Sequence, residues 1–212
     1  MAYTTGALVT QIQNKLDDTS FSSSLLKQFL NDSQREIFNS RMSKFVEKTQ
    51  DFTLTVGQDS IGTLPTDLQM VIDLRITSPY NYANVLTPYD IQEFDVNFPQ
   101  PALAGNALPI LWYRFGSTIN VFPRPNQAYT VQLRYFKTPN ELVNDADVPE
   151  LPSEFQELLV LGAYMRALEF NDNYDQAAII KRKFDEMLDI MTKRYSPGIA
   201  SATLMGVNRR NR

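Results

Sequence analysis

The chain has 212 residues, of which 43% are hydrophobic and 21% charged, so it can form one sizeable core or two small domains that share an interface. It contains neither cysteine nor histidine, which excludes disulfides, thiolate and histidine metal sites, and catalysis by Ser-His or Cys-His pairs. The formal net charge of −4 argues against nucleic-acid binding over the whole surface, because phosphate contacts need clustered Lys and Arg.

Proline placement divides the chain into three parts. All prolines except Pro197 lie between Pro65 and Pro152. Proline interrupts helix interiors but is tolerated in turns and at strand edges, so the outer parts are predicted to be helical and the middle to hold strands and loops. The predicted fold class is α+β, with a helical bundle formed by the N- and C-terminal helices, a central antiparallel β sub-domain and an extended C-terminal tail.

The expected organisation has four segments. They are N-terminal helices over 1–48, a β-rich sub-domain with a short helix over 49–146, C-terminal helices over 147–195 that pack on the N-terminal ones, and the tail over 196–212.

The N-terminal part has the periodicity of two helices. Leu8, Ile12 and Leu16 recur every four residues. Ser22, Ser23 and Ser24 are N-cap candidates for the second helix. One stripe of this second helix consists of Leu26, Phe29, Leu30, Ser33 and Ile37. The two helices are predicted to pack as a hairpin.

From Thr49 onward the pattern becomes that of strands. "QDFTLTV" alternates, with Phe52, Leu54 and Val56 on one face. "LPTDLQMVIDLRITSP" then predicts a turn over 64–67, followed by one strand. Its apolar residues are Met70, Ile72, Leu74 and Ile76.

A short helix is predicted from "TPYDIQEFD". Thr87 is its expected N-cap, Pro88 takes the first helical position, and acidic residues follow in the first turn. The next stretch, "NFPQPALAGNALP", is rich enough in Pro and Gly to predict a long loop.

The strongest strand signal covers residues 110–136. "ILWYRF" and "TINVF" flank Gly116-Ser117 and predict a hairpin. "INVFPRP" is a corner into the next strand, in which Arg124 is the residue expected to be free to meet a neighbouring subunit. The next strand, "AYTVQLRYF", is predicted to place four residues on one face: Tyr129, Val131, Leu133 and Tyr135.

The C-terminal part returns to helical periodicity. A helix opened by Pro152 and Ser153 is apolar nearly all round and is therefore predicted to be buried. The last helix is amphipathic, with Lys181, Arg182 and Lys183 on its wet face. These cations are either simply solvated or meet acids of a neighbouring subunit in a ring.

The segment "SPGIASATLMGVNRRNR" has no periodicity and cannot build a core of its own. It contains Ile199, Leu204 and Met205, and it ends in three arginines without an acid: Arg209, Arg210 and Arg212. Two interpretations remain open. The segment is a frayed terminus, or it folds on a partner, as apolar segments without a core often do.

Five carboxylates are the candidates for metal-assisted or acid-base chemistry: Asp67, Asp73, Asp90, Glu93 and Asp95. Capping and solvation explain each of them more simply, so no catalytic residue, metal or cofactor is expected. Seven aromatic residues interleaved with Arg114, Arg124 and Arg134 are candidates for base stacking, although a β core with outward arginines is favoured. They are Trp112, Tyr113, Phe115, Phe122, Tyr129, Tyr135 and Phe136.

Three segments in order resemble the head-to-tail adaptor (connector) proteins of tailed bacteriophages. They are "LPTDLQMVIDLRI", "YRFGSTINVFPRPNQAYTVQLRYFKTPNEL" and "ELPSEFQELLVLGAYMRALEFNDNYDQAAIIKRKFDEML". The matching positions are Gly116, Ile119, Pro123, Pro125, Tyr135, Pro139, Leu151, Pro152, Gly162 and Ala163. The resemblance covers residues 64–190, and the first 60 residues carry no matching signature.

The resemblance implies a structural virion protein and not an enzyme. Similar adaptors form rings, usually of twelve copies, beneath the portal, extend the DNA channel and join the capsid to the tail. The implied partners are other copies of the chain, the portal protein, a tail or nozzle protein, and genomic DNA that passes without sequence-specific binding. The C-terminal tail would dock on the portal, and Arg124 and residues 181–183 are candidate inter-subunit contacts.

The implied location is the virion neck, after synthesis in the host cytoplasm. The N-terminus has no basic segment followed by an apolar run, and no stretch reaches the roughly 18 apolar residues of a membrane span, so no membrane partner is expected.

Three alternatives remain. One is another phage neck or tail-tube structural protein, the second is a carboxylate-dependent hydrolase, and the third is a single-strand binder that uses the aromatic strands.

Overall fold

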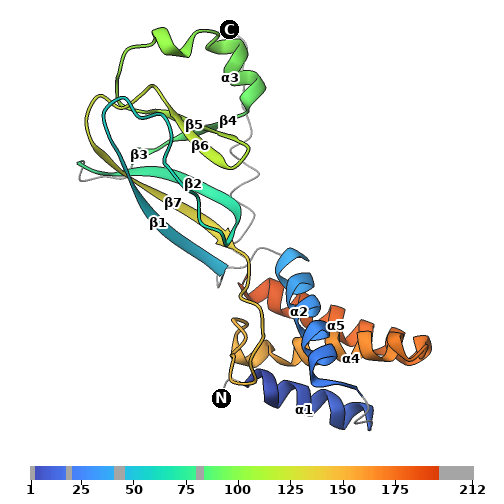
Figure 1. Cartoon of the computed structure of the whole chain (residues 1–212). Helices are drawn as coiled ribbons and strands as arrows, with labels where there is room; N and C mark the ends of the chain where they lie inside the picture. The colour runs from blue at the N-terminus through green and yellow to red at the C-terminus, as the bar shows by residue number, and fades with distance from the viewer. Residues whose placement is uncertain (1–2, 18–20, 41–45, 80–83, 196–212) are drawn as a thin grey trace. The chain divides into compact units, whose positions relative to one another are not determined.

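The computed structural model describes residues 3–17, 21–40, 46–79 and 84–195. The chain divides into two compact units (Figure 1). The β unit spans Glu47–Lys137, and the helical unit contains the described residues before and after it. The chain therefore leaves the helical unit once and returns to it once. The α+β fold class is confirmed.

The helical unit is built around one buried helix. Its elements are α1 (Thr5–Leu16), α2 (Ser23–Ser40), the 3₁₀ turn η3 (Ser153–Phe155), α4 (Glu157–Phe170) and α5 (Tyr174–Tyr195). α1, α2 and α5 all pack against α4. Burial on several sides explains the apolar circumference of α4, in which Leu158, Leu159 and Val160 are all fully buried.

Two sequence expectations for these helices need correction. α1 and α2 contact each other, but each packs more extensively on α4. They are therefore better described as two helices packed on α4 than as a helical hairpin. Pro152 and Ser153 begin a 3₁₀ turn, and the α-helical hydrogen bonds start only at Glu157. The expected N-cap role of Ser22 is confirmed, because its hydroxyl accepts a hydrogen bond from the Leu25 amide at 3.2 Å.

The amphipathic character of α5 is confirmed. Phe184 and Met191 are fully buried on its inner face, whereas residues 181–183 are exposed. The helix therefore contributes apolar packing to the helical unit and a charged face to the solvent.

Gly162 sets the spacing of the helices at the middle of α4. A Cβ atom at this position would lie 2.7 Å from Ser33 Oγ and 2.8 Å from Ser33 Cβ on α2, and 3.1 Å from Phe184 Cε2 on α5. These distances are shorter than van der Waals contact, so only a residue without a side chain allows both neighbours to approach this closely.

The β unit contains two sheets. The four-stranded sheet has the order β1 (Glu47–Leu54), β7 (Tyr129–Lys137), β2 (Leu68–Ser78) and β3 (Asn84–Val85). The three-stranded sheet has the order β4 (Thr87–Tyr89), β5 (Leu111–Phe115) and β6 (Thr118–Phe122). The pairings between these strands are antiparallel except that of β4 with β5, which is parallel. The β sub-domain is thus mixed and not purely antiparallel as expected.

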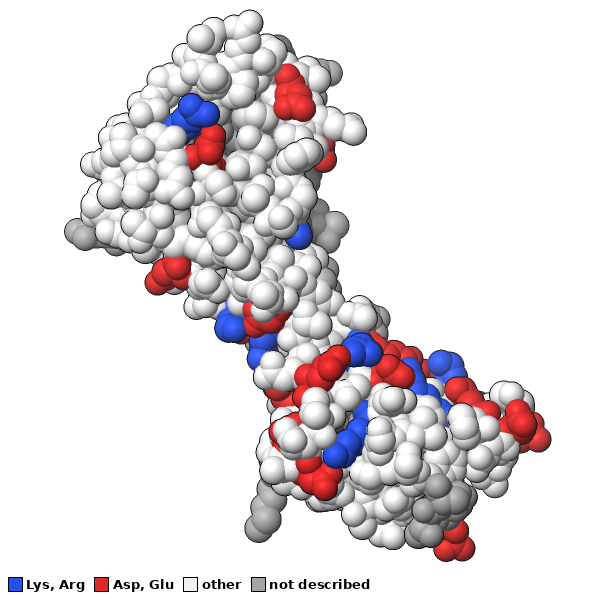
Figure 2. Space-filling model, viewed as in Figure 1, with Lys and Arg blue, Asp and Glu red and all other residues white. Residues whose placement is uncertain are grey.

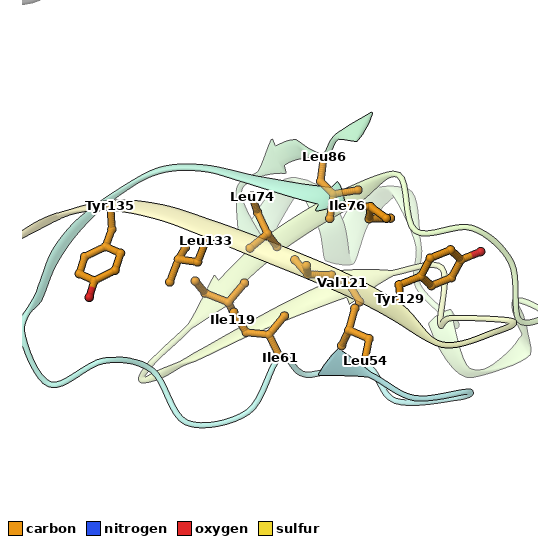
Figure 3. Packing of buried hydrophobic residues seen from close by; sticks show 11 residues of the cluster. Leu54, Ile61, Leu74, Ile76, Leu86, Ile119, Val121, Tyr129, Leu133 and Tyr135 are labelled. Atoms are coloured by element: carbon orange, nitrogen blue, oxygen red, sulfur yellow. The ribbon is translucent and has the colours of Figure 1, made fainter. Parts of the chain in front are cut away.

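The main core of the β unit lies between the sheets. The predicted inward row of β7 is confirmed, since Tyr129, Val131, Leu133 and Tyr135 are all at most 2% exposed. Figure 3 shows Leu133 of β7 beside Ile119 and Leu74, in the same buried cluster as Tyr129 and Tyr135. Alternate residues of a strand face opposite sides, so the intervening residues of β7 lie on the outer face of the sheet.

β2 departs from the simple alternation that the sequence suggested. The register of β2 against β7 shifts at three places, including between Val71 and Asp73. Such bulges insert an extra residue and reset which side chains face inward. Leu74 and Ile76 are fully buried as expected, but Met70 and Ile72 are 46% and 37% exposed.

The predicted turn of the hairpin between β5 and β6 is confirmed. Phe115 pairs with Thr118 across the two residues Gly116 and Ser117. Gly116 has a φ of 59°, which glycine adopts without the steric cost that a side chain would add.

The short helix α3 (Ile91–Asn97) begins later than predicted. Its N-cap is Asp90, whose carboxylate accepts a hydrogen bond from the Gln92 amide at 2.8 Å. The predicted cap, Thr87, and the predicted first helical residue, Pro88, lie instead in β4. β4 is an edge strand, where the missing amide of proline does not interrupt the sheet.

We expect Gly162→Ala to lower the free energy of unfolding of the helical unit by about 1 to 3 kcal/mol, the usual cost of overpacking. Circular dichroism at 222 nm during chemical denaturation measures this change. Glu169→Ala, at an exposed position of the same helix, is the control and is expected to change stability by less than about 0.5 kcal/mol. Equal stability of Gly162→Ala and wild type would contradict the close approach of the helices.

Candidate functional site

The five candidate carboxylates do not converge on one site. Asp73 lies on β2 and Asp67 in the turn before it, whereas Asp90, Glu93 and Asp95 belong to the start and body of α3. Within the described ranges, no group of three or more acidic, histidine or cysteine side chains is placed to hold a metal ion.

Asp73 is the centre of an ion-pair network on the outer face of the four-stranded sheet. It lies opposite Arg134 on β7, whose Nε donates a hydrogen bond at 2.8 Å, and Arg75 Nη2 donates another at 2.9 Å. Burial alone would raise the pKa of the Asp73 carboxyl, but the two guanidinium groups outweigh it and lower the pKa. The network keeps the carboxylate ionised and ties β2 to β7.

Asp67 has a similar structural role at the entry to β2. It accepts hydrogen bonds from Lys48 Nζ at 2.7 Å and from the Tyr135 hydroxyl at 2.9 Å. Burial acts to raise the pKa of Asp67, while the Lys48 and Tyr135 hydrogen bonds lower it to a net value below its ordinary one. This carboxylate joins the turn to β1 and β7, and an ionised acceptor so engaged is a poor general acid.

The acids of α3 differ from Asp67 and Asp73, because none of them forms an ion pair with a described residue. Asp90 caps the helix. Glu93 and Asp95 are exposed, and neither forms an ion pair with any residue that the structure describes.

Four of the seven candidate aromatic residues are core residues, whereas Phe115 is 67% exposed, so the seven do not form one stacking platform. Phe122, Tyr129, Tyr135 and Phe136 are buried. Tyr113 is stacked on Phe94 of α3, with ring centroids 4.2 Å apart. The favoured interpretation of this stretch, a β core with outward arginines, agrees with these positions.

The arginines beside these aromatic residues have different surroundings. Arg134 is held by Asp73. Arg124 is not free as expected, because it forms an ion pair with Asp59 at 3.0 Å. Arg114 forms no ion pair with a described residue, and its Nε donates to the Gly116 carbonyl at 3.1 Å.

Arg114 lies in a groove of about 520 Å³ in the β unit. The groove is also lined by residues of the turn before β2 and of the β5–β6 hairpin, among them Leu64, Pro65, Leu68 and Ser117. Sequence reasoning placed Arg114 among outward arginines but had no signal for the groove, since its walls are far apart along the chain.

Charge is distributed unevenly over the chain. On the face visible in Figure 2, Lys, Arg, Asp and Glu crowd the helical unit and are sparse on the β unit. Residues 181–183, the candidate inter-subunit cations of α5, are exposed in the helical unit.

The predicted tail contacts lie outside the described residues. They are Ile199, Leu204, Met205, Arg209, Arg210 and Arg212. In the described part of the chain, no helix is both long and apolar enough to cross a membrane.

We expect Asp73→Asn to destabilise the β unit by about 1 to 2 kcal/mol at pH 7, because the charged hydrogen bonds are lost while Arg134 is still partly solvated. The folded-state pKa of Asp73 is lowered, so its stabilisation is present above the ordinary pKa of 3.8. The difference from wild type should therefore shrink as the pH falls below that value.

Fluorescence of Trp112, the single tryptophan, during denaturation at several pH values measures this effect, since Trp112 packs on the β core. Asp51→Asn is the matched control, because this exposed carboxylate accepts a hydrogen bond only from the neutral amide of Gln132 at 3.1 Å. A pH-independent deficit in Asp73→Asn would show that the ion pairs are not its cause.

Comparison with known proteins assigns the chain to a family. No curated protein matches it significantly. A family model described as SU10 adaptor protein matches residues 3–205, which include both units and extend beyond the segments that carried the phage-adaptor resemblance. The match also includes the N-terminal helices, for which the sequence offered no signature. The chain therefore belongs to the SU10 adaptor protein family, in agreement with its resemblance to phage head-to-tail adaptors.

Proposed function

We propose that this protein is a structural component of a phage virion that forms a ring beneath the portal, extends the DNA channel and joins the capsid to the tail. The observation that carries the proposal is the family match over residues 3–205, which is nearly the whole chain. A ring of twelve copies, as is usual in similar adaptors, located in the virion neck is the arrangement that we propose. Its partners would be the portal protein and a tail or nozzle protein.

The surroundings of the carboxylates support a structural role. Lys48 and Arg134 pair with Asp67 and Asp73 across strands, and Asp90 caps a helix. These contacts account for the three acids as parts of the fold, so they leave the hydrolase alternative without an observation that favours it.

Net charge supports passage of DNA through the ring. At −4 per subunit, acids repeated around a channel would repel the phosphate backbone and let the duplex slide, whereas a lumen lined with Lys and Arg would hold it. A map of the assembled ring whose lumen is dominated by basic side chains would contradict this part of the proposal.

We propose particular segments for the contacts between subunits and with the portal. The exposed cations 181–183 of α5 would meet acids of the next subunit. Arg124 is a second candidate there, through the part of its guanidinium that Asp59 leaves free for another partner. The tail over 196–212, with its apolar residues and terminal arginines, would dock on the portal.

Electron microscopy of the purified full-length protein, alone and mixed with portal-bearing capsids, tests the proposed function. A closed ring, free or seated on the portal, is the expected result. Protein that stays monomeric and unbound at every concentration tested would overturn it.

Deletion of residues 196–212 tests the docking role of the tail. We expect the truncated protein to keep its thermal unfolding transition, because both units have their own cores, but to lose at least about tenfold in affinity for portal-bearing capsids, equivalent to one or two lost contacts. Cosedimentation with capsids measures the binding. A second variant, in which only the three terminal arginines are changed to Gln, separates charge from apolar contacts. Normal capsid binding by the truncated protein would refute tail docking.

A further inference from the structure

The groove around Arg114 in the β unit offers a guanidinium that no described residue neutralises, beside an apolar surface. Arg114 Nε is occupied by the Gly116 carbonyl, which leaves the two terminal nitrogens of the guanidinium as donors. Leu64, Pro65 and Leu68 form an apolar wall of the same groove. A guanidinium binds a carboxylate with two parallel hydrogen bonds, so the groove suits an acidic side chain flanked by an apolar one.

The outer face of α3 has the complementary composition. Phe94 is buried against the sheet, and the helical period of 3.6 places Val96 on the opposite side, with Glu93 and Asp95 flanking it. Val96 is 80% exposed. Neither flanking carboxylate has an ion-pair partner among the described residues. This face thus presents one apolar side chain between two unpaired acids.

The groove and the outer face of α3 lie on opposite sides of the three-stranded sheet. Tyr113 of β5 points toward α3, as its stacking on Phe94 shows. Side chains alternate along a strand, so its neighbours Trp112 and Arg114 point to the other side, where Trp112 packs on the core between the sheets. The outer face of α3 therefore cannot bind in the groove of its own β unit.

We propose that the outer face of α3 of one copy of this chain binds in the Arg114 groove of the next copy. Two different surfaces on opposite sides of a unit make a head-to-tail contact, which is the type of interface that closes into a ring. The inference rests on the proposed ring and names one of its interfaces. Carboxylates 93 and 95 provide the charge, and Val96 excludes water from the contact.

Charge exchange tests the pairing in full-length protein. Arg114→Glu places like charges at the interface and is expected to raise the protein concentration needed for ring formation by at least about tenfold. Glu93→Lys with Asp95→Lys should have the same effect. Combining all three substitutions should restore rings, because opposite charges again face each other. Glu169→Lys, the same acid-to-base change at an exposed position of α4, is the control and should assemble like wild type.

Disulfide crosslinking provides a second measurement that does not depend on charge. The chain has no cysteine, so Val96→Cys and Thr63→Cys, at an exposed residue of the groove, introduce the only thiols. Oxidation of the double variant is expected to give a ladder of covalent oligomers. The two single-cysteine variants are the controls for the double variant, and each should remain monomeric on a denaturing gel.

The outcomes separate this inference from the proposed function. If Arg114→Glu forms rings as wild type does and the double-cysteine variant does not crosslink, the proposed interface is wrong. The adaptor function is unaffected by that result. Crosslinking that stops at dimers would overturn the head-to-tail arrangement. If Arg114→Glu forms normal rings but these rings do not attach tails, the groove binds a tail protein and not a second copy of the chain. Absence of rings in wild type would overturn both proposals.

Discussion

The β unit depends on the double pairing of β7. This strand hydrogen bonds to β1 along one edge and to β2 along the other, although β1 and β2 come more than 50 residues earlier in the chain. Its inward row, from Tyr129 to Tyr135, fills the space between the sheets, and its outward Arg134 holds Asp73. Tyr135 also bonds Asp67. One strand thus contributes residues to the core, pairs with both neighbouring strands and contacts both carboxylates.

The described charges fall into two groups with different consequences. Ion pairs such as Arg166–Glu36 and Arg194–Glu154 in the helical unit are satisfied within the subunit. Arg114, Glu93 and Asp95 have no ion-pair partner among the described residues, and the arginine lies on the opposite side of the three-stranded sheet from the two acids. Exposed pairs contribute little to stability. Charges that a subunit cannot pair by itself are the ones that specify which surfaces of other molecules it binds.

Sequence reasoning succeeded where a pattern is local. The period of α4, the hairpin at Gly116 and the inward row of β7 follow from the side chains of single segments, and the structure confirms each of them. It failed where contact with a distant segment determines the secondary structure or the direction of a side chain. Thr87 and Pro88 looked like a helix start, but pairing with β5 makes them a strand, and the bulges of β2 turned Met70 and Ile72 outward.

The sequence by itself determined the α+β class and the order of helical and β parts, because proline placement and periodicity act over a few residues, and it also contains the motifs that resemble the phage adaptors. Only the tertiary structure decided which charges are paired. Arg114, Arg124 and Arg134 look alike in the sequence. They differ because the fold brings Asp59, 65 positions away, to Arg124 and Asp73, 61 positions away, to Arg134. Coulombic pairing acts over a few ångströms in space, a distance that position along the chain does not encode.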